Sequence, residues 1–435
     1  MSIEVPVPNN PQGPILIPTQ EKPERPISPP ARRALYPSLL VNQLVVVGTI
    51  VAFNAIVLPI QVMIVSHGNP VLKVNNLAVI TTAATVVQLL VQPIVGAISD
   101  RTRSRFGRRA PYLIIGAAVL GAACVGMGQI TSIPLLALAY SLIQIGLNMI
   151  QGPLSAVAPD RVPIKHRGIV SAFIGMGAGL GGTLGITLAS KILPNIAATY
   201  STFGALVLIV TLAFVLINRD SSSRDMVNPS FSWGRFIGGF WINPRKHPDF
   251  AWALALRFVY YVGYQVISAY QFYILTDYIK LPEQQAQNDS ALLALAFMIS
   301  SVVLLPLAGF LSDRVGRRKP FILIAVVLMV IGAIFPLLSP SLGSMLALQA
   351  FFGASFGFFA SCDFALMTEV LPGGGTGAAK DLGILNLGTQ VPVVLSTVIG
   401  AVVINHLGGY PALFGFGIVV VALSAFTLIP IKSVR

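Results

Sequence analysis

The sequence predicts an all-α integral membrane protein with twelve transmembrane helices in two pseudo-symmetric six-helix bundles. Three observations support this fold class. Of the 435 residues, 55% are hydrophobic and only 10% are charged, whereas about 25% of residues are charged in an ordinary soluble domain. The chain contains twelve long apolar runs, and its most distinctive charged motif occurs twice.

Each apolar run is long enough to cross a bilayer, which takes about 20 helical residues. Residues 1–37 contain ten prolines and few bulky apolar groups, so we expect a disordered Pro-rich tail there. Six runs then form a first bundle over 38–217, a polar and basic central loop covers 218–249, and six further runs form a second bundle over 250–435. The predicted helices cover residues 38–64, 75–99, 111–129, 133–158, 168–192, 197–217, 250–279, 289–311, 320–338, 341–369, 381–404 and 409–430.

Lysines and arginines fall almost entirely on one side of these helices. Of the 28 in the chain, 24 lie in segments on the side of the N-terminus, three (Lys73, Lys191 and Lys280) lie on the other side, and Arg257 lies inside a helix. Such an excess is typical of the cytoplasmic side, so we expect a plasma (inner) membrane protein with both termini in the cytoplasm. The central loop segment FSWGRFIGGFW suits the headgroup region there. This excess of basic residues also accounts for the net charge of +13. Because the membrane orientation explains the charge, we expect no nucleic-acid partner.

A charged motif connects the second and third predicted helices of each half. The first copy, GAISDRTRSRFGRRAPYL, covers 96–113, and the second, GFLSDRVGRRKPFIL, covers 309–323. The cytoplasmic charge bias accounts for the arginines but does not predict Gly, Asp, Gly and Pro repeating in the same order. We therefore predict that both loops make gating contacts at the cytoplasmic seam between the bundles. The predicted gating residues are Gly96, Asp100, Arg101, Gly107, Arg108, Arg109, Gly309, Asp313, Arg314, Gly316, Arg317 and Arg318.

This repeated motif resembles the signature of the major facilitator superfamily, a Gly-x-x-x-Asp-Arg-x-Gly-Arg-Arg loop after helices 2 and 8. The stretches VQPIVGAISDRTRSRFGRRAP (91–111), NMIQGP (148–153) and LGILNLGTQVP (382–392) resemble its sucrose/proton symporter branch, part of the glycoside-pentoside-hexuronide cation symporters. The resemblance implies the major facilitator fold, rocker-switch alternating access and a small sugar or glycoside substrate, commonly driven by protons or another cation. We expect a monomer in the lipid bilayer.

The sequence departs from that branch on predicted helix 4. Where the plant sucrose symporters have an aspartate and an arginine for proton coupling and sugar binding, this chain has Gln144 and Ser155. A uniporter or exporter of another small organic solute therefore stays open as an alternative. A different class, a non-transporting sensor or a lipid-moving membrane scaffold, also stays open, although a sensor would need a longer cytoplasmic segment.

Polar side chains recur at helical spacing on several predicted helices. The stripe on helix 4 begins at Gln144, and helix 7 combines tyrosines with amides. Neutral donors and acceptors suit sugar hydroxyls at a lower desolvation cost than charges, although amides inside a membrane also bond helices to one another. The predicted substrate-binding residues are Asn54, Gln61, Gln144, Asn148, Gln151, Ser155, Tyr261, Tyr264, Gln265, Gln271, Asn386 and Gln390.

Ionisable groups inside a membrane are costly, so they are functional candidates. Arg257 either has a functional role or extends its side chain to the interface. Asp363 is too short to do this, which favours a proton carrier or a partner of Arg257, with a gate contact as the alternative. The predicted coupling residues are Asp363, Arg257, Glu369 and Asp160.

Other chemistry is not indicated. The four histidines lack metal-ligand spacing, and Cys124 and Cys362 lie in apolar helices. The glycine-rich run GMGAGLGGTLG at 175–185 follows no strand, so we predict helix packing rather than a nucleotide-binding loop. We expect no enzyme activity, metal or cofactor.

Overall fold

The computed structural model describes residues 29–162, 164–193, 195–219, 223, 244–370 and 378–431. Twelve helices in these segments are long and apolar enough to cross a membrane, in agreement with the predicted number. The predicted tail up to residue 28 and the segment at 231–241 lie outside the described residues. The elements are α1 (Pro29–Ala52), η1 (Phe53–Val57, π-helical), α2 (Leu58–Val65), α3 (Pro70–Arg101), α4 (Ala110–Met127), α5 (Ile133–Arg161), α6 (Ile164–Ile192), α7 (Ile196–Ile217), α9 (Pro248–Ser268), α10 (Gln271–Tyr273), η2 (Ile274–Tyr278, π-helical), α11 (Glu283–Val315), α12 (Lys319–Leu338), α13 (Leu342–Val370), α14 (Ala378–His406) and α15 (Gly409–Phe426).

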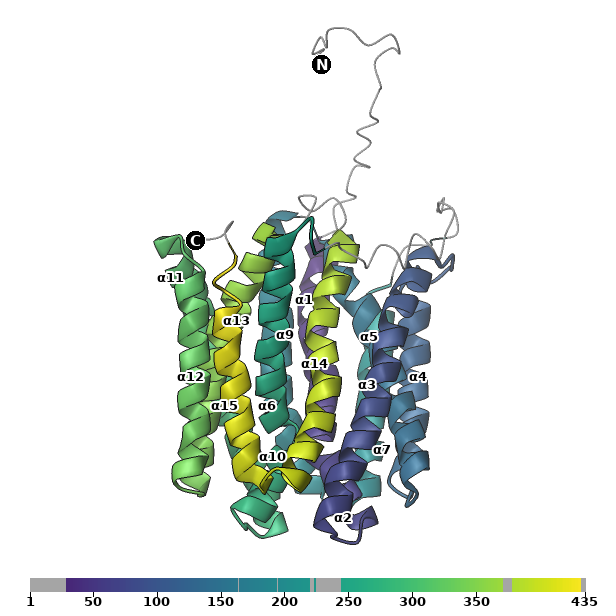
Figure 1. Ribbon diagram of the computed structural model, residues 1–435. Coiled ribbons are helices and arrows are strands. Elements are labelled where there is room, and N and C mark those ends of the chain that lie inside the picture. The colour runs from purple at the N-terminus through teal and green to yellow at the C-terminus, as the bar shows by residue number, and fades with distance from the viewer. Residues whose placement is uncertain are drawn as a thin grey trace, which may run out of the picture.

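The helices stand side by side and form a bundle with two ends (Figure 1). We call the end where α1 begins and α15 ends the terminal face. The opposite end, where α2 ends and α3 begins, is the far face. Because consecutive spans alternate in direction, the connection between α3 and α4 and the connection between α11 and α12 both lie at the terminal face.

The two halves of the chain repeat one packing pattern. In the first half, α1 packs on α6 and α7, α5 packs on α3 and α4, and α4 packs on α7. In the second half, α9 packs on α14 and α15, α13 packs on α11 and α12, and α12 packs on α15. The halves meet along two equivalent seams, α3 with α14 and α6 with α11. The predicted fold of two pseudo-symmetric six-helix bundles is therefore confirmed.

Glycine sets the spacing between α1 and α6. A Cβ atom added at Gly185 would lie 2.2 Å from the carbonyl oxygen of Gly48, and one added at Gly181 would lie 2.4 Å from that of Leu44. A side chain at either position would separate the two backbones. The glycine-rich run therefore packs α6 directly on α1, as small residues do in membrane helices.

Local signals explain where α3 begins. The Asn69 side chain accepts two hydrogen bonds of 3.0 Å from the free backbone N–H groups of Val71 and Leu72. Pro70 suits the first helical position because its missing N–H would have no partner there. The helix consequently begins five residues before the predicted start at residue 75, and Lys73 lies in its first turn.

Candidate functional site

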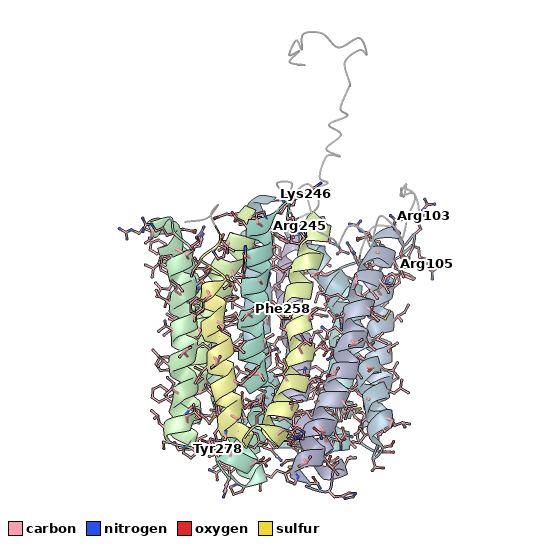
Figure 2. The ribbon with its side chains drawn as sticks, viewed as in Figure 1. Arg103, Arg105, Arg245, Lys246, Phe258 and Tyr278 are labelled. Carbon is pink, nitrogen blue, oxygen red and sulfur yellow. The ribbon has the colours of Figure 1, made fainter. Side chains whose placement is uncertain are left out.

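The first copy of the charged motif folds back on the end of α3. Arg109 forms an ion pair with Asp100 (Nη2–Oδ1, 2.7 Å) and donates a hydrogen bond to Ser99 Oγ at 3.2 Å. Gly107 turns the loop with a φ of +85°, a conformation that favours glycine. Figure 2 shows Arg103 and Arg105 of this loop at the terminal face.

The second copy has the same arrangement at the end of α11. Arg318 forms an ion pair with Asp313 (Nη1–Oδ1, 2.5 Å) and donates to Ser312 Oγ at 2.7 Å. Its Nε lies 3.5 Å from Glu369 Oε1 on α13, and Gly316 turns the loop with a φ of +67°. These ion pairs of both loops lie within one bundle each, so in this conformation they fasten the loops to their own helices. The gating role stays a prediction.

Arg257 and Asp363 form an ion pair inside the second bundle. Arg257 Nε on α9 lies 3.3 Å from Asp363 Oδ2 on α13, and the Asp363 side chain is 1% exposed. Asp363 Oδ1 and Arg257 Nη1 have no hydrogen-bond partner among the described residues. The structure thus brings together two of the four predicted coupling residues, and pairing with Arg257 is one of the roles expected for Asp363. Glu369 lies at the terminal face, and the Asp160 side chain is outside the described residues.

An aromatic cluster adjoins this ion pair. Tyr261, which is half-buried, lies close to both charges. One turn further along α9, Tyr264 packs on Phe352 of α13 with 5.5 Å between ring centroids. Beyond it, Gln271 accepts a hydrogen bond of 2.6 Å from Gln349 Nε2. Tyr261 and Tyr264 on α9 and Gln271 in α10, all predicted to bind substrate, therefore each contact α13.

The polar stripe of the first bundle is neutral and mostly internal. On α5, Asn148 is buried and donates to the backbone oxygen of Gln144 at 2.8 Å. Asn54, in η1, is exposed, and its Oδ1 accepts a hydrogen bond of 2.9 Å from the buried Tyr140 hydroxyl on α5. Ser155 is also exposed, and its hydroxyl donates to the backbone oxygen of Gly152 in the same helix. Tyr140 was not among the predicted residues, because a tyrosine surrounded by apolar residues gives no local signal.

The other predicted residues have varied surroundings. Gln61 is buried and donates to the carbonyl oxygen of Met127 at 2.7 Å, which ties α2 to the end of α4. Gln151, Gln265 and Gln390 are half-buried. For Asn386 only its place in α14 is described. Their substrate-binding role stays a prediction.

A charge pair at the far face was missed by the sequence analysis. Lys73 Nζ on α3 lies 2.6 Å from Asp277 Oδ1 in η2. The predicted start of helix 2 left Lys73 in a connection, although Asn69 followed by Pro70 is a recognisable helix start. Nothing in the sequence indicates that the two residues meet across the bundles.

The family model described as MFS/sugar transport protein matches residues 48–374. The chain belongs to this family. It is therefore a multi-pass membrane transporter and not an enzyme, and the predicted resemblance is confirmed. The match spans both charged loops and the ion pair between Arg257 and Asp363.

Sequence relatives of this family member transport different solutes. The chain is 28% identical over 321 residues to an oxalate:formate antiporter of Oxalobacter formigenes, with 68% of this chain and 70% of that protein covered. It is 30% identical over 141 residues to a citrate-proton symporter of Klebsiella pneumoniae, covering 29% and 31%. It is 29% identical over 115 residues to a sucrose transport protein of Arabidopsis thaliana, covering 21% and 22%.

Solved structures share the fold. A nucleoside transporter has a TM-score of 0.75 at 13% identity, with 91% of this chain and 99% of that chain covered. A D-xylose-proton symporter has a TM-score of 0.64 at 16% identity, with 93% and 97% covered. At these identities the likeness shows the fold alone.

Proposed function

We propose that this transporter moves a small neutral sugar or glycoside by alternating access between the two bundles, as a monomer coupled to protons or another cation. The observation that carries the proposal is the ion pair in the second bundle. Arg257 inside the seventh span has a carboxylate 3.3 Å away, so the pair contributes no net charge toward an anionic substrate. A neutral solute fits such a site better than a dicarboxylate does.

Exposed polar groups on the first bundle support the same substrate class. Asn54 is exposed, although it lies 11 residues, or about 16 Å, from the end of the first span at Val65. An amide facing lipid at that depth is costly. The Asn54 side chain is held by the Tyr140 hydroxyl and donates one N–H to the Ile50 carbonyl oxygen. We infer that the amide faces a water-accessible substrate path, where its second N–H and second lone pair offer hydrogen bonds to hydroxyl groups.

The basic residues support a proposal for the sidedness of the protein. We propose that the terminal face is cytoplasmic and that the protein resides in the plasma (inner) membrane. Arg103, Arg105, Arg245 and Lys246 all lie at this face (Figure 2), and an excess of such residues is typical of the cytoplasmic side.

The first test is uptake into proteoliposomes of labelled sucrose, maltose and simple glycosides, with and without an inward proton gradient. We expect accumulation of one sugar when the gradient is present. Equilibration without accumulation would contradict proton coupling, and no sugar movement would contradict the substrate class. Oxalate and citrate serve as anionic comparison solutes in the same vesicles.

Asp363 is the proposed proton carrier, and a double substitution tests it. Arg257→Gln combined with Asp363→Asn keeps a polar amide at both positions and leaves no buried charge behind. We expect this variant to lose gradient-driven accumulation and to retain exchange of the sugar across the membrane, because amides do not carry the proton. Unchanged accumulation would exclude Asp363 from coupling.

A second candidate function is exchange of small carboxylates. It is favoured by Arg257 Nη1, which is buried and lacks a hydrogen-bond partner among the described residues, since guanidinium groups bind carboxylates well. Exchange of labelled oxalate against internal formate, with no sugar transport, would decide for this alternative.

A further inference from the structure

Several side chains contact the charge pair at the far face. Asp277 Oδ1 lies 2.6 Å from Lys73 Nζ and accepts a hydrogen bond of 3.0 Å from Thr276 Oγ1. Asp277 Oδ2 accepts a hydrogen bond of 2.8 Å from the Tyr410 hydroxyl. Lys73 Nζ also lies over the Tyr273 ring, 4.9 Å from its centroid. Three further residues thus contact the pair, which joins the first bundle to the second.

The position of Lys73 makes it depend on this pairing. Lys73 is a cation in the first turn of α3, and a helix N-terminus favours negative charge. Asp277 lies in the single turn of η2 and accepts hydrogen bonds from Thr276 and Tyr410 of its own bundle. Lys73 therefore lacks support from its own helix, and its counter-charge comes from the opposite bundle.

Burial adds to this dependence. The side chains of Lys73 and Asp277 are 5% and 22% exposed. An ammonium group buried without a counter-charge is very costly. The two groups can therefore part only when water reaches them, which requires the bundles to separate at the far face.

Other contacts at the same face also cross between the bundles. The Tyr273 hydroxyl donates to the carbonyl oxygen of Pro59 on α2 at 2.9 Å. Asn405 Nδ2 on α14 donates to Asn75 Oδ1 on α3 at 2.8 Å. The far side is therefore closed in this conformation.

We propose that Lys73 and Asp277 form an ionic latch that holds the far side of the transport path closed and separates each time that side opens. The latch differs from the charged loops at the terminal face, whose ion pairs of Asp100 with Arg109 and Asp313 with Arg318 lie within one bundle. It acts on the equilibrium between the closed and open far side, so it is independent of which solute the protein carries.

The test uses a cysteine that only an open far side exposes. Thr397 on α14 is 4% exposed, and its hydroxyl lies 3.3 Å from that of Thr82 on α3. Thr82 is nine residues, or about 13 Å, further along α3 than Lys73. In a background with Cys124→Ala and Cys362→Ala, Thr397→Cys is labelled with a membrane-impermeant thiol reagent applied in vesicles to the far-face side.

We expect Lys73→Met and Asp277→Asn each to raise the labelling rate at least about tenfold, within the range of known coupling factors between sites. Lys191→Met and Glu283→Gln are matched controls, since both residues are exposed near the far face. These controls should label at the parent rate. Latch variants that also label at the parent rate would overturn the proposal.

A charge swap separates the latch from a general effect on folding. Lys73→Asp combined with Asp277→Lys restores an ion pair, so labelling should fall below the rate of either single variant. It should stay above the parent rate, because an aspartate in place of Lys73 is favoured by the N-terminal end of α3 when the pair is apart. Labelling as fast as in the single variants would contradict a role for the pair.

Cross-linking gives a second measurement. Asn75→Cys and Asn405→Cys place two thiols across the far mouth, and a short bifunctional thiol reagent should join them in the parent protein. With the cross-link in place, we expect Thr397→Cys to stay unlabelled even in the Lys73→Met variant. Rapid labelling despite the cross-link would show that the reagent does not enter by opening of the far side.

Discussion

The two bundles have the same helix packing but different polar chemistry. Away from the terminal face, polar contacts among the described residues of the first bundle join neutral groups, such as Asn54 with Tyr140 and Asn148 with the backbone of Gln144. In the second bundle, α9 and α13 are joined by the ion pair of Arg257 and Asp363. The repeated packing therefore does not require repeated chemistry.

The difference matters because the two kinds of contact respond differently to substitution. A neutral hydrogen bond contributes about 1 kcal/mol, and its loss is small when both partners are replaced or can find others. A buried charge that loses its partner costs about 3–5 kcal/mol. We therefore expect the second bundle to be the more sensitive of the two.

The largest expected effect is the loss of one charge from the ion pair. Asp363→Asn leaves Arg257 without a counter-charge and should lower the free energy of unfolding by about 3 kcal/mol or more. In the first bundle, Asn148→Leu should lower it by about 1 kcal/mol or less, since the Gln144 carbonyl keeps its helical hydrogen bond. Thermal unfolding in detergent measures both variants.

The double variant with Arg257→Gln and Asp363→Asn is the control. It should recover most of the stability lost in Asp363→Asn, because no unpaired charge is left. If the double variant is as unstable as the single one, packing around Asp363 rather than charge is the cause, and the contrast between the bundles disappears.

A second pair of substitutions compares how each bundle packs its first helix. The two glycines lie on equivalent helices, Gly185 on α6 and Gly388 on α14. A Cβ atom at Gly185 would lie 2.2 Å from the backbone oxygen of Gly48, whereas one at Gly388 would lie 2.8 Å from Leu254 Cδ1, the end of a flexible side chain. Gly185→Ala should cost about 2 kcal/mol through overpacking.

Gly388→Ala should change the free energy of unfolding by less than about 1 kcal/mol, because Leu254 can adjust and alanine favours the helix. Both variants are measured by thermal unfolding, as above. Equal losses in the free energy of unfolding would mean that α14 packs on α9 as tightly as α6 packs on α1.

The sequence predicted the fold well because apolar length is a local property. Each apolar run predicts a membrane span from its own residues alone, and the repeated loop motif indicates two halves. The pairing of Arg257 with Asp363 was one of two expected roles, since charges inside a membrane need partners. The contact between Lys73 and Asp277 was beyond prediction, because it depends on which helix ends meet when the far side is closed.

The smallest expected effect compares the two charged loops. Arg109 is 8% exposed and its partner Asp100 is 50% exposed, whereas Arg318 and Asp313 are 19% and 68% exposed. Each carboxylate can be rehydrated when its arginine is replaced, so Arg109→Gln and Arg318→Gln should each lower the free energy of unfolding by about 1 kcal/mol or less. Within that range Arg109→Gln should lower it more than Arg318→Gln does, because the less exposed Arg109 side chain also loses packing.

Salt distinguishes these two losses. Exposed ion pairs weaken as the ionic strength rises, whereas packing does not. Raising the salt concentration in the thermal unfolding experiment should therefore remove most of the difference in stability between Arg318→Gln and the parent protein. It should remove less of the difference in stability between Arg109→Gln and the parent protein. The same salt dependence in both variants would mean that one kind of interaction holds both loops. The bundles would then differ in their membrane interior but not at the terminal face.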